Sequence, residues 1–306
     1  MASAFQVFLN PVLPIFAILG FGILFAQRGI FDTNAASVLN RFVFYAGAPA
    51  LLFSLLTGAS LAEFEWRVLM LYFTSEMAVY AAGITLARWV FRRDWREAML
   101  LGMTACFVNH VFFLLPMARV LYGEAASAPI AAIVVIDTVL IFALTIVALE
   151  LSAPGVHSGR HVLALLIKHP LLQAIGAGLL VNLAGIPLHD GMSTFTHFVG
   201  AAAAPIGLFA LGIILSSTAD RNVDKLAISI VGLKVFVHPL LAWLLYTNAA
   251  ALANPAWTST ALLLAAGPCG AMPFVLALQY KVNVTTISRA VGYSTLLSLV
   301  TLAVMA

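Results

Sequence analysis

Three charged side chains lie inside long apolar stretches, where a charge needs a chemical reason. Glu76, Asp137 and Lys234 are each surrounded by mostly apolar residues. A charge at the centre of a bilayer costs about 2.5–3.5 kcal/mol on insertion scales, so such a residue usually pairs, binds a substrate or moves a proton. Glu76 and Lys234 could form a buried ion pair, or Glu76 could exchange a proton while Lys234 tunes its pKa. Asp137 is a candidate proton or sodium site.

A second candidate site is an interrupted apolar stretch, "AAGPCGAMPFVLALQY" (265–280), in which Pro268, Gly270 and Pro273 fall near the middle. Proline removes a backbone donor and clashes with the preceding turn, so a helix here should kink or break. Irregular backbone at membrane depth is tolerated where it is buried in protein or lines a cavity. Half-helix N-termini carry roughly half a positive charge, which suits an anion. The break therefore predicts a binding site, which Tyr280 could close unless it is an ordinary interfacial aromatic residue.

A related stretch is "NHVFFLLP" (109–116), which pairs polar side chains with a proline. Asn109 could cap a half-helix or donate a hydrogen bond to a substrate carboxylate. His110 could face the site or simply pack against its neighbours. Pro116 is expected to interrupt this helix as Pro273 interrupts its own.

These sites belong to an all-α integral membrane protein, as the composition indicates. The 306 residues are 63% hydrophobic and 9% charged, whereas soluble domains are about 45–50% apolar and about 25% charged. Apolar segments long enough to cross a bilayer predict ten transmembrane helices, at about 5–26, 35–57, 67–90, 97–121, 127–150, 161–183, 194–217, 225–248, 256–279 and 284–305. The N-terminus lacks the basic region and cleavage site of a signal peptide. Cys106 and Cys269 offer neither a disulfide framework nor metal spacing, and Cys269 lies in the predicted site.

The distribution of Lys and Arg predicts the orientation. Of the 15 basic residues, twelve fall in or beside the loops after odd-numbered helices, Arg67 and Arg119 fall on the other side, and Lys234 is inside a helix. The positive-inside rule places the odd loops in the cytoplasm and both termini outside. The net charge of +3 then reflects topology and contact with anionic lipid, and is no argument for nucleic acid.

The two halves of the chain, 1–155 and 156–306, repeat one another. A shift of 156 residues aligns "LPIFAILGFGILFAQRGI" (13–30) with "HPLLQAIGAGLLVNLAGI" (169–186), and it aligns Pro49 with Pro205. Five helices per half is an odd number, so the second copy would be inverted in the membrane. Inverted repeats with interrupted helices at matching positions are typical of secondary transporters with a site near the midplane. Pro49 and Pro205 could be scaffold hinges or mere kinks.

The motifs resemble those of the auxin efflux carrier family. "LNRFV" followed by Pro49 resembles the second helix of that family, the spacing from Asn109 to Pro116 resembles the fourth, and "PCGAMPFVLALQY" resembles the ninth. The resemblance covers the whole chain and implies a scaffold of helices 1, 2, 6 and 7, a transport domain of helices 3–5 and 8–10, and a substrate beside crossing helices 4 and 9. It also implies a bacterial member similar to malonate and related carboxylate transporters, with a dimer through the scaffold.

One departure from the family concerns helix 4. The family has small residues between the positions of Asn109 and Pro116, whereas this chain has His110 and then bulky apolar residues. We therefore expect a helix 4 that is less unwound and a pocket that is narrower or more aromatic.

The leading hypothesis is a carrier of small organic anions that works by alternating access, either potential-driven or coupled through Asp137 or Glu76. Gly20, Gly22, Gly176 and Gly178 would let scaffold helices approach closely. A sodium- or proton-coupled cation antiporter or symporter using Asp137 is the alternative, and a channel is a further alternative. An enzyme or sensor is disfavoured, since there is no nucleophile with a base at helical spacing, no metal cluster and no phosphate-binding glycine loop. No cofactor is expected, and the predicted location is the bacterial inner membrane.

Overall fold

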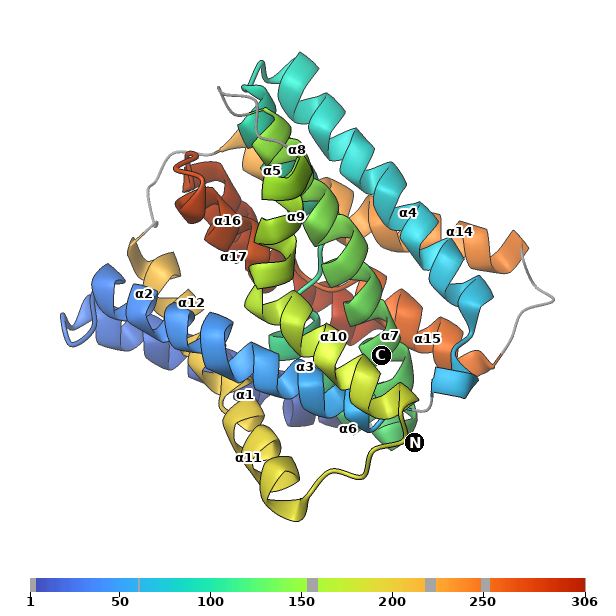
Figure 1. The fold of residues 1–306 in the computed structure, drawn as a ribbon. Coiled ribbons are helices and arrows are strands. Elements are labelled where there is room, and N and C mark those ends of the chain that lie inside the picture. The colour runs from blue at the N-terminus through green and yellow to red at the C-terminus, as the bar shows by residue number, and fades with distance from the viewer. Residues whose placement is uncertain (1–3, 60, 153–158, 218–223, 249–253, 306) are drawn as a thin grey trace.

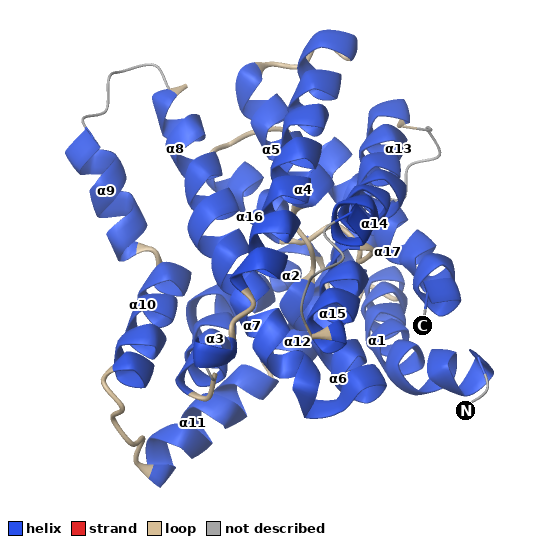
Figure 2. Cartoon of the chain, turned by 90° about the vertical axis from the view of Figure 1, so that its right-hand side faces the viewer, coloured by secondary structure: helices blue, strands red, loops and turns tan. Residues whose placement is uncertain are grey.

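The structure, a computed structural model, describes the chain except residues 1–3, 60, 153–158, 218–223, 249–253 and 306. The described part consists of helices and connecting segments, with no strand (Figure 2). The all-α fold class is therefore confirmed. Five helical stretches are long and apolar enough to cross a membrane: Thr33–Thr57, Trp66–Val90, Ser127–Leu151, Asp190–Ser217 and Lys225–Asn248. The full set of ten spans stays a prediction.

The first half of the chain contains α1 (Ala4–Gln27), α2 (Thr33–Phe42), α3 (Ala48–Thr57), α4 (Trp66–Thr85), α5 (Trp95–Cys106), α6 (Leu115–Tyr122), α7 (Ser127–Ile136) and α8 (Ala143–Leu151). The second half contains α9 (Gly159–Lys168), α10 (Pro170–Leu183), α11 (Asp190–Ala201), α12 (Ala203–Ser217), α13 (Lys225–Gly232), α14 (His238–Asn248), α15 (Pro255–Ala265), α16 (Met272–Gln279) and α17 (Thr285–Met305). Five segments form wider π turns: η1 (Val43–Gly47), η6 (Asp137–Phe142) and η7 (Leu233–Val237) each join two of these helices end to end, η3 (Leu86–Val90) extends α4, and η4 (His110–Leu114) leads into α6. Two short 3₁₀ turns, η2 (Leu61–Glu63) and η5 (Gly123–Ala126), complete the set.

Three of the π segments directly precede a helix with proline in its first turn. These are η1 before Pro49, η4 before Pro116, and η7 before Pro239. Proline has no N–H to donate, and its ring crowds the carbonyl four residues earlier. A wider turn relieves this crowding without ending the helix. These prolines therefore modify their helices, and Pro116 itself is not where helix 4 breaks.

The helices pack as two groups. In the first group, α1 packs along α12, and α3 packs against α10 and α11. In the second group, α4 packs against α5 and α14, α5 against α16, and α13 against α17. In Figure 1, α1, α2 and α12 lie together at one corner, while α4 and α14 run side by side at another. Two buried apolar clusters underlie this packing, one centred on α3, α7 and α15 and the other on α5, α8 and α13.

Two glycines bring the helices of the first group into backbone contact. A Cβ on Gly22 would lie 2.2 Å from the carbonyl oxygen of Phe209, and one on Gly178 would lie 3.2 Å from that of Phe53. The predicted close approach therefore holds at Gly22 and Gly178. It was wrong for Gly20 and Gly176, which face open space because they lie on the opposite sides of their helices.

Candidate functional site

Two interrupted helices cross at the centre of the molecule. The first is interrupted at residues 107–109, between α5 and η4, and the second at residues 266–271, between α15 and α16. Val108 and Cys269 form an antiparallel bridge there. The backbone N–H of Asn109 donates to the Pro268 carbonyl at 3.1 Å, and the backbone N–H of Gly270 donates to the Phe107 carbonyl at 2.8 Å. The two interrupted segments therefore pair some of the backbone N–H and C=O groups that the breaks leave free, as buried backbone groups require.

The sequence of the second break fits this crossing closely. A Cβ on Gly270 would lie 2.7 Å from the Phe107 ring and 2.8 Å from the Val108 carbonyl oxygen, so glycine alone fits without displacement. The Cys269 amide donates to Ser294 Oγ at 3.0 Å, and Cys269 is fully buried. Pro273 stands in the first turn of α16, where a missing N–H costs nothing. The break after Ala265 was thus correctly predicted, whereas helix 4 breaks at 107–109 and not at Pro116.

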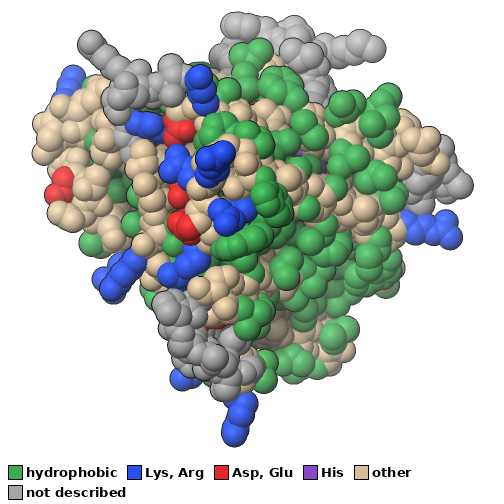
Figure 3. Space-filling view, turned by 90° about the horizontal axis from the view of Figure 1, so that it is seen from above, with side chains coloured by type: hydrophobic (Ala, Val, Ile, Leu, Met, Phe, Trp, Pro, Cys, Tyr) green, Lys and Arg blue, Asp and Glu red, His purple; other side chains and the backbone are tan. Residues whose placement is uncertain are grey.

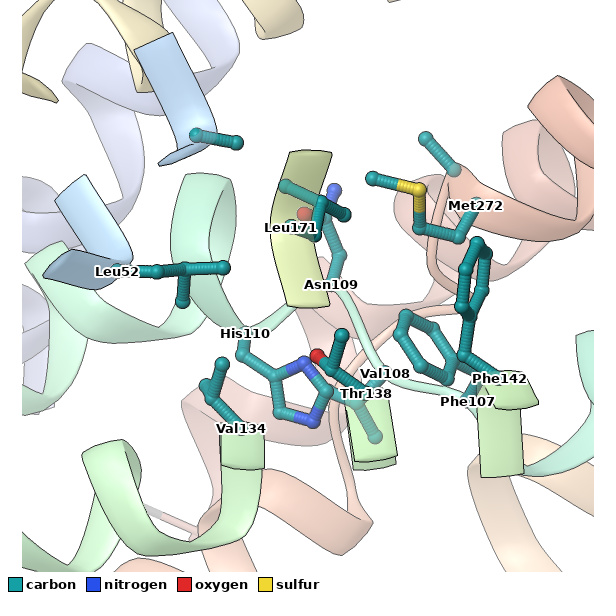
Figure 4. A pocket seen from close by; sticks show the side chains of 12 residues that line it. Leu52, Phe107, Val108, Asn109, His110, Val134, Thr138, Phe142, Leu171 and Met272 are labelled. Atoms are coloured by element: carbon teal, nitrogen blue, oxygen red, sulfur yellow. The ribbon is translucent and has the colours of Figure 1, made fainter. Parts of the chain in front are cut away.

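A small cavity lies beside the crossing, between the two packing groups. Its volume is about 50 Å³. Its polar residues are Asn109, His110 and Thr138, and its apolar wall is made by Ala48, Leu52, Phe107, Val108, Val134, Phe142, Leu171, Ala271 and Met272. Figure 4 shows the His110 ring beside Thr138 and Val134, with Phe107, Phe142 and Met272 on the other side. An apolar pocket with a few convergent polar groups is the usual form of a small-molecule site.

His110 connects this cavity to the buried carboxyl groups. Its Nε2 lies 2.5 Å from Asp137 Oδ2, with the two side chains 4% and 0% exposed. Glu76 is fully buried, and Asp137 is a neighbouring charge that acts on it. Neither oxygen of Glu76 accepts a hydrogen bond from an amide, hydroxyl or ammonium group. The arrangement is therefore a row of titratable groups that ends at the cavity.

Lys234 does not form the ion pair with Glu76 that was one of the two expectations. Its Nζ donates to the Ala265 carbonyl at 2.8 Å and lies 2.9 Å from His238 Nδ1. Ala265 is the last residue of α15, so the ammonium sits at the negative end of that half-helix. The helix break created a better acceptor than the carboxylate, which the sequence pattern could not show. Lys234 thus stabilises the crossing itself.

Other predicted residues lie away from the cavity. Tyr280 ends α16 and donates its hydroxyl to Glu150 Oε1 at 2.8 Å, with the Arg96 guanidinium over its ring. Arg93 contacts Glu97 at 3.6 Å. Figure 3 shows Lys, Arg, Asp and Glu side chains gathered on one face, beside a largely apolar surface. Tyr280 does not line the cavity.

The predicted scaffold prolines occupy comparable places. Pro49 stands in the first turn of α3 after the η1 turn, and Pro205 stands in the first turn of α12, just after the interruption between α11 and α12 at residue 202. In both places the regular α-helix is interrupted directly before the proline. Their role as hinges stays a prediction.

A larger cavity of about 640 Å³ also separates the two groups. It is lined from one side by α2, η1 and α12, including Asn40 and Arg41, and from the other by α16 and α17, including Gln279 and Ser288. A smaller hollow shares Asn40 and Ser288 with it and shares Ala271 with the cavity at the crossing. The three hollows thus adjoin one another from the end of α2 to the crossing.

Three polar residues of this site were missed from the sequence as site residues. Thr138 follows Asp137 and was overlooked because threonine is common in apolar helices. Ser294 occupies the position in the second half of the chain that corresponds to Asp137 in the first half. This correspondence was the available signal for its position beside Cys269. His238 contacts Lys234, and their separation of four residues on one helix face was the available signal. Among the described residues, no group of three or more His, Cys, Asp or Glu side chains is placed to hold a metal ion.

Comparison with known proteins gives a consistent result. Residues 7–306 match the family described as membrane transport protein. A "putative malonate transporter" of Rhizobium meliloti is 27% identical over 296 residues, covering 95% of this chain and 92% of that protein. An "uncharacterized transporter" of Methanothermobacter thermautotrophicus is 27% identical over 297 residues, covering 96% of this chain and 95% of that protein.

Proposed function

Because the chain belongs to the membrane transport protein family, the family of the auxin efflux carriers, we propose that it carries small carboxylates such as malonate by alternating access. The observation that carries this proposal is the crossing of two interrupted helices beside a cavity with three polar side chains. Broken helices at the bundle centre are the usual place of substrate binding in secondary transporters.

The chemistry of the cavity favours a carboxylate. Asn109 and Thr138 offer uncharged donors, and His110 offers a ring nitrogen that becomes a cation when protonated. The chain at Ala271 and Met272, which opens α16, forms part of the wall, so the positive end of this half-helix faces the cavity. The apolar wall would exclude water and strengthen each of these interactions. Pro268, Cys269, Gly270, Pro273 and Pro116 act in this proposal through the backbone, by shaping the crossing.

The packing supports a division into a scaffold of helices 1, 2, 6 and 7 and a transport domain of helices 3–5 and 8–10. The cavities lie between these groups, where a relative movement would change access. The contacts of Gly22 with Phe209 and of Gly178 with Phe53 exchange under the 156-residue shift, which supports the inverted repeat. In the predicted topology the larger cavity opens towards the cytoplasm, so this conformation is inward-facing, and both termini are outside. A bacterial inner-membrane location and a scaffold dimer complete the proposal.

The experiment that tests the proposal is thermal unfolding of the purified protein against a panel of carboxylates, with sodium and potassium salts compared. Ligands that bind the folded state raise the melting temperature as concentration exceeds the dissociation constant. We expect a selective rise with malonate or a related small carboxylate. A rise with sodium alone, and none with any anion, would replace the proposal with a cation transporter using Asp137.

A further inference from the structure

We propose that His110, Asp137 and Glu76 hold one exchangeable proton, which the protein takes up together with its anion, and that His110 links the two binding events. This inference rests on the proposed function and names its coupling ion. The row runs inward from the cavity, with His110 at the cavity wall, Asp137 behind it and Glu76 innermost.

The carboxyl groups of Glu76 and Asp137 act on one another electrostatically in a buried site, and one proton relieves their repulsion. Two ionised carboxylates have only acceptors, so they cannot hydrogen-bond to one another. Both groups are fully buried, and neither accepts a hydrogen bond from a neighbouring amide or hydroxyl. Two like charges so placed repel strongly, and the stable arrangement shares one proton between them.

Counting the buried charges also gives one proton. The other titratable groups that face the cluster are Tyr72, Cys106, Lys234, His238 and Tyr246. Of these, only Lys234 ordinarily carries a charge at neutral pH. With Lys234 as an ammonium, two carboxylates leave one uncompensated negative charge in a buried site. A single proton, on His110 or on either carboxyl group, makes the cluster neutral, which burial favours.

An anion in the cavity makes that proton more favourable and moves it towards the substrate. A carboxylate placed beside His110 brings another negative charge near the cluster, and a proton on the imidazole then faces it as a cation. The proton on the cluster and the anion therefore stabilise each other by direct electrostatics. By reciprocity, each strengthens the binding of the other by the same factor.

The geometry favours a proton over sodium. A sodium ion needs several oxygen ligands around it, whereas one oxygen of Asp137 already contacts His110 Nε2 at 2.5 Å. The ammonium of Lys234, which contributes to the field at both carboxyl groups, would repel a second cation. A proton fits between the existing atoms without displacing any of them.

The test is calorimetric titration of the full-length protein with malonate at several pH values from about pH 7 to about pH 10, where malonate carries both negative charges, in buffers of different ionisation enthalpy. The dependence of the heat on the buffer gives the number of protons taken up for each anion bound. We expect this uptake to rise with pH from near zero, where the empty cluster already holds its proton, to about one proton, where the empty cluster has lost it. In that upper range the apparent Kd should rise about tenfold per pH unit. Glu76→Gln should reduce the uptake to near zero. Glu97→Gln, at a buried carboxyl group outside the cluster, should retain it.

The outcomes separate this inference from the proposed function. Malonate binding by the wild type with no proton uptake at any pH in this range overturns the proton site and leaves the carrier proposal intact. Uptake that survives Glu76→Gln shows that the proton does not depend on Glu76 and also overturns the three-residue site, and sodium-dependent affinity without proton uptake makes the site a cation site. If no carboxylate binds the wild type at all, the proposed function fails first. The wild-type titration decides the question even if the Glu76 variant does not fold.

Discussion

Replacing Gly270 by alanine should separate the two crossing helices. Gly270 packs directly against the other interrupted helix, where an added Cβ would lie 2.7 Å from Phe107 Cδ1 and 2.8 Å from the Val108 carbonyl oxygen. The ring could rotate, but the carbonyl belongs to the bridge between Val108 and Cys269 and cannot move alone. The substitution therefore forces the two breaks apart.

The expected cost follows from what this displacement removes. Overpacking of a buried site costs about 1–3 kcal/mol. The two amide bonds across the crossing, at 2.8 and 3.1 Å, contribute about 1 kcal/mol each if they are lost. The total is roughly 3–5 kcal/mol if both bonds are lost, which for a chain of this size lowers the melting temperature by roughly 5–8 °C. Malonate affinity should fall as well, since the cavity shares Phe107 and Val108 with the crossing.

The assay is thermal unfolding with and without malonate, for Gly270→Ala and for Gly232→Ala as the matched control. Gly232 ends α13 and has no atom within 4 Å of an added Cβ, so alanine there should be neutral or stabilise by about 0.5–1 kcal/mol. A Gly270→Ala protein that melts and binds malonate like the wild type would refute the argument that this tight crossing forms the site.

Three further substitutions test individual parts of the structure by their melting temperatures. Lys234→Met removes the cation at the end of α15 and leaves two buried carboxyl groups without it, so we expect a loss of about 3–5 kcal/mol; an unchanged melting temperature would contradict the capping role. Gly178→Ala, whose Cβ would lie 3.0 Å from Leu56 Cβ, should separate α10 from α3 and cost about 1–3 kcal/mol. Asn182→Ala should cost about 1–3 kcal/mol, because its amide donates to the carbonyls of Leu56 and Ala59 at 2.8 and 2.7 Å. No loss from either change would show that these helix contacts are not needed.

The sequence predicted a helix break correctly where the local residues themselves determine the backbone conformation. The break after Ala265 was predictable because Pro268, Gly270 and Pro273 cannot continue a regular helix. The break in helix 4 was placed wrongly, at Pro116, because its position is set by pairing with another segment. Phe107–Asn109 contains no helix breaker, and these residues leave the helix since they exchange amide bonds with residues 268–270.

The structure was also needed to show which groups the buried polar side chains contact. The apolar surroundings of Glu76 and Lys234 marked both as charges needing a partner, yet the Lys234 ammonium donates to a carbonyl that is a free acceptor only because α15 ends there. His110 was left undecided between facing the site and packing, and it lines the cavity while contacting Asp137. Tyr280 matched a motif but lies against Glu150, since α16 is long enough to carry it beyond the cavity.

The most direct test of the central claim is malonate counterflow in proteoliposomes, comparing the wild type with Asn109→Ala and Arg93→Ala. The Asn109 side chain lines the cavity, whereas Arg93 contacts Glu97 outside it. The crossing site predicts exchange of labelled malonate by the wild type, retention by Arg93→Ala, and roughly a tenfold or greater loss of apparent affinity for Asn109→Ala, equivalent to one buried hydrogen bond. Equal effects of the two substitutions, or a larger effect at Arg93, would contradict a carboxylate site at the crossing of the two broken helices.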